Sequence, residues 1–266
     1  MRKGEGPAAP AVVRASLLLA ALGYFVDIYD LILFSIVRVK SLKSIGVLDE
    51  NLLAEGMRLL DMQMGGMLIG GILWGVLGDK RGRLSVLFGS IAMYSLANIA
   101  NGFAQSVEAY GWLRLIAGIG LAGELGAGVT LIAEIMPKET RGYGTMIIAG
   151  VGILGGVVAG LIGDTFDWRS SYFIGGGMGL ALLALRIGVY ESGMFNTMLK
   201  DSKVSRGEFK TLFKSRDRIE RYACSILTGV PIWFVIGILA TYSPEFGRAL
   251  GMPEIPNPAR AVMYLY

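Results

Sequence analysis

Long runs of apolar residues, separated by short polar segments, dominate the sequence. Three of these runs contain no charged residue and are at least 22 residues long: Leu84–Val107, Gly142–Gly163 and Tyr222–Pro244. An α-helix of this length rises about 33 Å, enough to cross the ~30 Å hydrocarbon core of a membrane. Four further runs carry a few charges each. We therefore expect seven membrane-spanning helices, at about Ser16–Val37, Arg58–Gly78, Leu84–Ala104, Tyr110–Ile135, Gly142–Ile162, Ser170–Val189 and Tyr222–Tyr242, and an eighth that begins near Ala261.

The composition supports a membrane protein and excludes a soluble globule. Of the 266 residues, 53% are hydrophobic and only 17% are charged, whereas soluble domains carry about 25% charged residues. Gly occupies 39 positions, and Gly is frequent where membrane helices pack closely. Gly152, Gly156 and Gly160 recur every four residues, which predicts a packing face on the fifth helix. The expected fold class is an all-α integral membrane protein in contact with the lipid bilayer.

The basic residues predict how the chain crosses the membrane. If the N-terminus is cytoplasmic, 16 of the 25 Lys and Arg residues fall in cytoplasmic segments, seven in outer segments, Arg38 among them, and two within the spans. Cytoplasmic loops carry the excess of Lys and Arg in membrane proteins. We expect a multi-pass protein of the plasma membrane, such as a bacterial inner membrane, with a cytoplasmic N-terminus and a basic cytoplasmic linker over residues 198–221.

The residues that are missing exclude several kinds of chemistry. The chain has no His and a single Cys, Cys224. Ser-His-Asp and Cys-His catalysis, internal disulfides, Cys-rich zinc sites and thiol redox pairs are therefore excluded. We expect neither a cofactor nor a metal, and a membrane enzyme is disfavoured. The net charge of +4 does not indicate a nucleic-acid partner, because an excess of Lys and Arg in a membrane protein usually reports orientation.

One short motif stands between the second and third expected helices. It reads Gly75-Val-Leu77-Gly-Asp79-Lys-Arg-Gly82-Arg83. Taken alone, such a charged turn can merely fix topology, with Gly permitting close helix approach and unusual backbone conformations. The complete pattern G-x-L-x-D-x-x-G-R, however, resembles the signature loop of the major facilitator superfamily, and all five specified positions match.

This resemblance implies a secondary transporter with two six-helix bundles that rock around a site near the membrane midplane. The chain supplies seven helices and part of an eighth, so we expect a truncated twelve-helix fold whose C-terminal bundle continues in a longer chain. The expected domains are a six-helix bundle over residues 1–197, the linker over 198–221, and the start of the second bundle over 222–266.

Other segments resemble the metabolite:proton symporter branch of this superfamily. The fourth helix carries Gly123-Glu124, although Ala122 replaces the first Gly of the G-G-E core of that branch. The resemblance implies proton-coupled symport of a small organic acid or a zwitterionic metabolite. A sugar or phosphate symporter is the alternative, because the first helix, with Asp27 and Asp30, also looks like those branches. A non-transporting receptor or scaffold is a further alternative. The fifth helix lacks the Pro typical of antiporters, which favours symport.

Charged residues inside the spans are the candidates for proton coupling and the substrate cavity, because a buried charge is costly unless it is paired or hydrated. Asp27 and Asp30 share a helical face, and Arg114 lies at a depth similar to Asp30. We expect Asp30 and Arg114 to form a proton-coupled pair, and we slightly prefer Asp30 over Asp27 as the proton carrier. A purely structural ion pair is the alternative. Glu124 is either a second proton site or a bond between helices.

A second set of charged and Gly residues is expected to cluster at the cytoplasmic face. We interpret this set as a gate network that holds in one transport state and breaks in the other. Its members are Gly75, Asp79, Arg81, Gly82, Arg83, Glu134 and Arg141.

Overall fold

The computed structural model describes residues 10–81, 83–137, 139–191, 213–252, 257 and 260. Within these residues the chain is helical and contains no strand, which confirms the all-α fold class. The helices are α1 (Pro10–Ser44), η1 (Asp49–Asn51), α2 (Leu52–Arg81), α3 (Arg83–Gly102), α4 (Val107–Ile135), α5 (Arg141–Thr165), α6 (Trp168–Glu191), α7 (Arg216–Phe234), the π-helix η3 (Val235–Ala240) and α8 (Ser243–Ala249).

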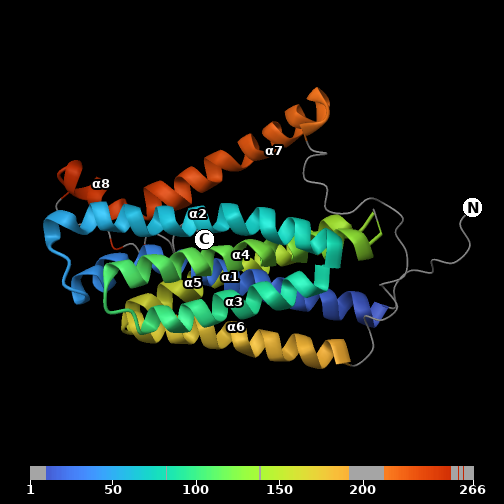
Figure 1. The fold of residues 1–266 in the computed structure, drawn as a ribbon, viewed down its shortest axis with the longest axis horizontal. Coiled ribbons are helices and arrows are strands. Elements are labelled where there is room, and N and C mark those ends of the chain that lie inside the picture. The colour runs from blue at the N-terminus through green and yellow to red at the C-terminus, as the bar shows by residue number, and fades with distance from the viewer. Residues whose placement is uncertain are drawn as a thin grey trace, which may run out of the picture.

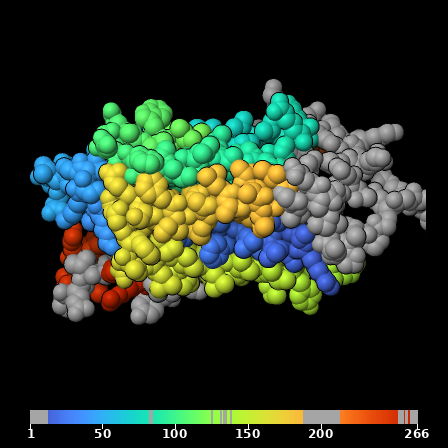
Figure 2. Space-filling view, turned by 90° about the horizontal axis from the view of Figure 1, so that it is seen from below, coloured from blue at the N-terminus to red at the C-terminus, as the bar shows by residue number. Residues whose placement is uncertain are grey.

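Helices α1 to α6 lie side by side along the long axis of the molecule and alternate in direction (Figure 1). The closest associations are those of α4 with α2 and α3, of α1 with α5, and of α6 with α3. On the face drawn in Figure 2, α6 lies between α3 and α1. Six helical stretches among the described residues are long and apolar enough to cross a membrane, in α1, α2 with η1, α4, α5, α6 and α7 with η3. Helix α3 packs against two of these helices, α4 and α6.

The bundle has two ends, the α2–α3 end and the α1–α2 end, after the helix connections that lie there. The α2–α3 end also holds the start of α1, the α4–α5 connection and the start of α7 (Figure 1). The α1–α2 end also holds the α3–α4 and α5–α6 connections and α8 (Figure 1). The segment 200–212 lies outside the described residues, but the start of α7 shares its end with the α2–α3 turn, as the charge pattern predicts.

Gly residues let the helix backbones touch. In α2, Gly66 and Gly70 face the backbone of α4, and Gly118 of α4 faces the carbonyl group of Gln63. In α5, the expected face of Gly152, Gly156 and Gly160 is buried, which confirms that prediction. Gly75, in contrast, faces open space, so the expected role of Gly75 in close helix approach is wrong.

Three helices extend six or more residues beyond their expected ends: α2 begins at Leu52 rather than at Arg58, and α1 and α7 are longer as well. Helix α1 continues to Ser44, and Arg38, which the charge pattern assigned to an outer segment, is a fully buried helical residue. Helix α7 begins at Arg216 rather than at Tyr222, because Ser215 accepts a hydrogen bond from the amide of Arg218 and the polar first turns form two i,i+4 ion pairs. The eighth helix expected near Ala261 lies outside the described residues.

Helix α7 stands apart from the bundle over most of its length. None of its described residues is buried, and Figure 1 shows it approaching the other helices only toward the α1–α2 end. There, Ala240 at the end of η3, followed by Thr241 and Tyr242, is buried. The segment after the linker therefore meets the six-helix bundle at one end only.

We expect Gly155→Ala to destabilise the bundle, because an added Cβ would lie 3.0 Å from the carbonyl carbon of Phe25 and closer still to its oxygen. Overpacking of this kind costs about 1–3 kcal/mol. Gly150→Ala is the matched control in the same helix, since a Cβ there meets nothing within 4 Å, and Ala favours a helix by up to about 1 kcal/mol over Gly. Unfolding in detergent measures both; equal stability of the two variants would contradict the packing assignment.

Candidate functional site

Asp27 and Asp30 lie on α1 in the interior of the bundle, and both are at least 96% buried. Among the described residues, no donor bonds to a carboxylate oxygen of Asp27, while the side-chain amide of Asn98 in α3 approaches the carboxylate of Asp30 without reaching normal hydrogen-bond geometry. Gly175 of α6 makes room for Asp30, since a Cβ at that position would lie 2.6 Å from its Oδ1 atom. Two neighbouring buried carboxylates with so few donors among the described residues are unusual, because native structures rarely leave buried polar groups unpaired.

Arg114 of α4 is fully buried near Asp30 but is held by other partners. Its guanidinium donates to the side-chain oxygen of Gln63 and, over 3.4 Å, to the hydroxyl of Tyr172. It also stacks over the ring of Phe34, 4.3 Å from the centroid. Among the described contacts, no hydrogen bond or ion pair joins Arg114 to Asp30, because the close packing of α2 on α4 brings Gln63 within reach of Arg114; the proton-coupled pair itself stays a prediction. The two charges remain close enough to attract each other.

Aromatic side chains extend from Arg114 toward the α1–α2 end. The hydroxyl groups of Tyr110 and Tyr172 share a hydrogen bond of 2.7 Å. Edge-to-face contacts join Tyr110 to Phe34, with centroids 6.1 Å apart, and Tyr172 to Trp168, with centroids 6.2 Å apart. These contacts surround one guanidinium with aromatic rings and hydroxyl groups.

Glu124 of α4 forms a two-pronged ion pair with Arg186 of α6. One bond, from Nη1 of Arg186 to Oε2, is 2.7 Å long, and the second joins Nη2 to Oε1. The same guanidinium donates to the carbonyl groups of Leu87 in α3, at 3.2 Å, and Leu19 in α1, at 3.1 Å. Gly23 lies against this pair, where a Cβ would collide with both side chains. Glu124 thus bonds neighbouring helices, which is one of the two roles expected for it.

Arg186 was not among the residues expected in the site. The signal was available, because a single Arg within an apolar span requires a carboxylate or a set of backbone carbonyls as partners. We define the central cluster as the buried ionisable residues that face the interior from α1, α4 and α6. Its members are Asp27, Asp30, Arg114, Glu124 and Arg186.

The described residues of the expected cytoplasmic gate lie at the α2–α3 end. Asp79 is half-buried near the end of α2, while Arg81 and Arg141 are exposed. Gly82 and the side chains of Arg83 and Glu134 lie outside the described residues. The structure therefore brings the backbones of the described members of this set to one end of the bundle, at the α2–α3 and α4–α5 connections (Figure 1), and the gate contacts themselves stay a prediction.

The model of the Major Facilitator Superfamily matches residues 56–266. The chain belongs to the major facilitator superfamily. Members of this superfamily are membrane transporters and not enzymes. The match covers the signature loop, Arg114 and Arg186 of the central cluster, and the segment from α7 onward. This accounts for the resemblance seen in the sequence.

Curated relatives and solved structures of this superfamily resemble the chain to different degrees. The niacin transporter NiaP of Acinetobacter baylyi is 31% identical over 174 residues, covering 63% of this chain and 36% of its own length. The 3-(3-hydroxy-phenyl)propionate transporter of Escherichia coli is 30% identical over 144 residues, covering 50% of this chain and 36% of its own length. A D-xylose-proton symporter shares the fold, with a TM-score of 0.63 at 16% identity over 94% of this chain and 64% of that one. The chain thus spans about a third of the length of these two curated relatives.

Proposed function

We propose that the protein is a secondary transporter that takes up a small organic acid together with protons by alternating access, with the central cluster as its coupling site. The observation that carries the proposal is the burial of two neighbouring carboxylates, Asp27 and Asp30, of which Asp27 has no hydrogen-bond donor among the described residues. The cluster has three carboxylates and two guanidiniums, so full ionisation would leave a net charge of −1 inside the bundle. Binding one proton neutralises it, which removes the cost of an unbalanced buried charge.

Asp27 is the carboxylate of the cluster that we assign to this proton. Glu124 is held by two hydrogen bonds from Arg186, and Asp30 is attracted by Arg114. Asp27 lies close to two other carboxylates, Glu124 and Asp30, with Arg186 as the attracting charge. Protonation of Asp27 therefore relieves repulsion on both sides. This assignment replaces the slight preference for Asp30, which depended on a direct pair with Arg114.

Arg114 and its aromatic neighbours support an organic acid as the substrate. A guanidinium pairs well with a carboxylate, and Phe34, Tyr110 and Tyr172 offer apolar ring faces with hydroxyl groups beside it. The names of two relatives, the niacin transporter and the 3-(3-hydroxy-phenyl)propionate transporter, each denote an aromatic ring with an acid group. We therefore favour an aromatic acid over other small metabolites, including zwitterions.

A sugar is the second candidate substrate. Asn98 and Asn101 of α3 are buried with side-chain atoms that have no hydrogen-bond partner among the described residues, and amide groups of this kind bind sugar hydroxyls. A phosphate substrate would bind at Arg114, in the place that we assign to the carboxylate of an organic acid.

Uptake into proteoliposomes tests the function and separates these candidates. Radiolabelled nicotinate should accumulate when the outside is more acidic and only equilibrate without a pH gradient. Benzoate should compete strongly, whereas D-xylose and inorganic phosphate should not. Accumulation of nicotinate that ignores the pH gradient would contradict proton coupling, and competition by xylose alone would favour the sugar reading.

We further propose that the α2–α3 end is cytoplasmic in a bacterial inner membrane, with the N-terminus on the same side and the domains bounded at residues 197 and 221. In a Cys224→Ala background, Glu50→Cys at the α1–α2 end should react with an impermeant maleimide on intact cells. Lys80→Cys should react only after lysis. Both positions are exposed, so the reverse labelling pattern would invert the topology.

A further inference from the structure

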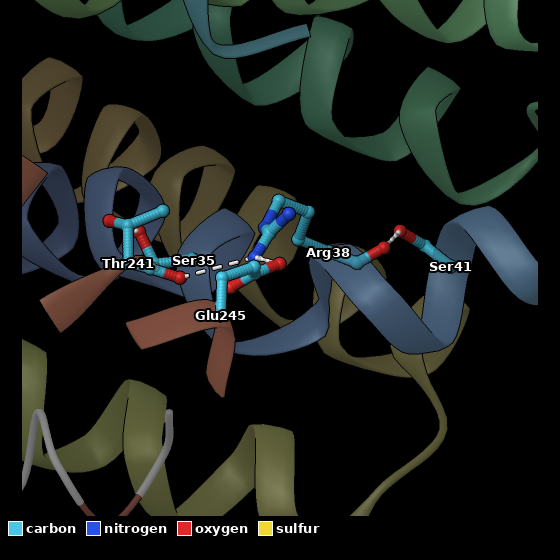
Figure 3. Close-up of polar contacts among 5 residues, drawn as sticks. All are labelled: Ser35, Arg38, Ser41, Thr241 and Glu245. Carbon is cyan, nitrogen blue, oxygen red and sulfur yellow. Dashed lines mark hydrogen bonds and ion pairs between the residues drawn. The ribbon is translucent and has the colours of Figure 1, made fainter. Parts of the chain in front are cut away.

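A fully buried arginine lies where the six-helix bundle meets the segment that follows α7. Arg38, near the end of α1, donates from Nη2 to Oε1 of Glu245 in α8 over 2.6 Å and to the carbonyl of Thr241 over 3.3 Å (Figure 3). Its guanidinium also stacks over the ring of Tyr242, 4.6 Å from the centroid. Three partners on one short segment therefore hold a single charged group of α1.

A second polar contact lies one helical turn earlier on α1. The hydroxyl groups of Ser35 and Thr241 are 2.7 Å apart and share a hydrogen bond (Figure 3). Because residues three apart lie on the same side of a helix, Ser35 and Arg38 present one face of α1 to the segment after α7. On the other side of Arg38, Gly56 of α2 makes room for the guanidinium, since a Cβ there would lie 2.7 Å from its Nη1 atom.

This junction is held by charged and polar groups rather than by apolar packing alone. Its charged groups are only partly paired, because Nε and Nη1 of Arg38 and Oε2 of Glu245 have no hydrogen-bond partner among the described residues. Partly paired charges hold a buried interface less firmly than apolar side chains do, and water satisfies them once the interface opens. Such a contact is suited to repeated breaking and closing.

The position of the junction fits the same role. Helix α7 contributes no buried residue, and the described contacts of this segment with α1 are found at the α1–α2 end (Figure 1). Alternating access requires that contacts between the two halves at one end break when the opposite end closes.

We propose that Arg38 and Glu245 form a latch, supported by Ser35 and Thr241, that keeps the α1–α2 end closed and must break before that end opens. The latch rests on the proposed alternating access, but its specific element is the charge on these two side chains. Removing one charge leaves the other without its partner and shifts the population toward the open form.

The distance between two spin labels at the α1–α2 end tests this latch. Leu48, before η1, and Leu250, after α8, are 64% and 77% exposed, so Leu48→Cys and Leu250→Cys in a Cys224→Ala background accept labels without disturbing the interior. In lipid nanodiscs we expect one predominant short distance. Glu245→Gln, which keeps the size of the side chain, should raise the share of longer distances about fivefold or more, the ratio that corresponds to roughly 1 kcal/mol.

A double-mutant cycle and a matched control make the test specific. In an Arg38→Gln background, Glu245→Gln should add little, because the interaction that it removes is already gone. Lys43→Gln is the control, since it breaks an exposed ion pair with Asp49, 2.6 Å long, at the same end of the bundle. Ser35→Ala provides a second, milder weakening of the latch, with an effect smaller than that of Glu245→Gln.

Unchanged distances in folded Glu245→Gln and Ser35→Ala would overturn the latch, and so would an equal change in Lys43→Gln. If Glu245→Gln does not fold, the Ser35→Ala result decides alone. The measurement needs neither substrate nor a pH gradient. A protein that lacks proton-driven uptake but shows the expected distances would therefore refute the proposed function and leave the latch standing.

Discussion

Replacing Asp27 with Asn is expected to abolish accumulation driven by a pH gradient. If one proton crosses with each substrate anion, no net charge moves. A gradient of one pH unit then supports up to about tenfold accumulation of the substrate, since each factor of ten corresponds to 1.4 kcal/mol. Asn cannot exchange a proton, so the accumulation ratio should fall from about ten to one. Exchange of substrate between equal pools requires no net proton movement and should continue.

Two further variants give this result its meaning. Asp30→Asn should keep the coupling and change the apparent affinity for substrate, because it alters the charge balance around Arg114. Asp61→Asn, at an exposed position of α2, should leave uptake unchanged. Loss of coupling in Asp30→Asn alone would identify Asp30 as the proton carrier. Normal coupling in both Asp27→Asn and Asp30→Asn would leave Glu124 as the carrier.

The helices and their order could be predicted from the sequence because the position of each helix depends on the apolar residues of its own segment. Runs without charge have the length of a membrane span, and the small residues of α5 mark its packing face. Errors occurred where a polar residue continues a helix beyond its apolar run. The rule for loop charges assigns Arg38 to an outer segment. The rule takes no account of a distant partner, and Glu245, 207 residues later, accepts a hydrogen bond from the buried Arg38.

The central cluster was predicted only in part, for a related reason. Burial of Asp27, Asp30, Arg114 and Glu124 follows from their place in apolar runs, whereas their partners depend on which helices pack together. The depth along each helix suggested Asp30 as the partner of Arg114, but the lateral arrangement places Gln63 of α2 against Arg114 instead. No sequence periodicity connects Glu124 with a residue 62 positions away on another helix.

The pair of Glu124 with Arg186 gives the largest expected effect on stability. Arg186→Gln removes a buried guanidinium that joins α6 to three other helices through Glu124 and the carbonyl groups of Leu19 and Leu87. It leaves the carboxylate of Glu124 buried without its charge partner, which costs about 3–5 kcal/mol. Chemical unfolding in detergent should show this loss. As a control, Arg169→Gln removes a more exposed donor to the carbonyl of Gly102 and should cost about 1 kcal/mol or less.

The double variant Glu124→Gln with Arg186→Gln distinguishes a charge effect from a loss of packing. Because replacing both partners of a buried pair can be nearly neutral, the double variant should regain much of the stability lost in Arg186→Gln. Additive losses in the two single variants would show that Arg186 acts through its packing and its carbonyl contacts alone. A recovered double variant that still couples uptake to protons would place Glu124 outside the proton path, because the only proton left to move would then be that of Asp27 or Asp30.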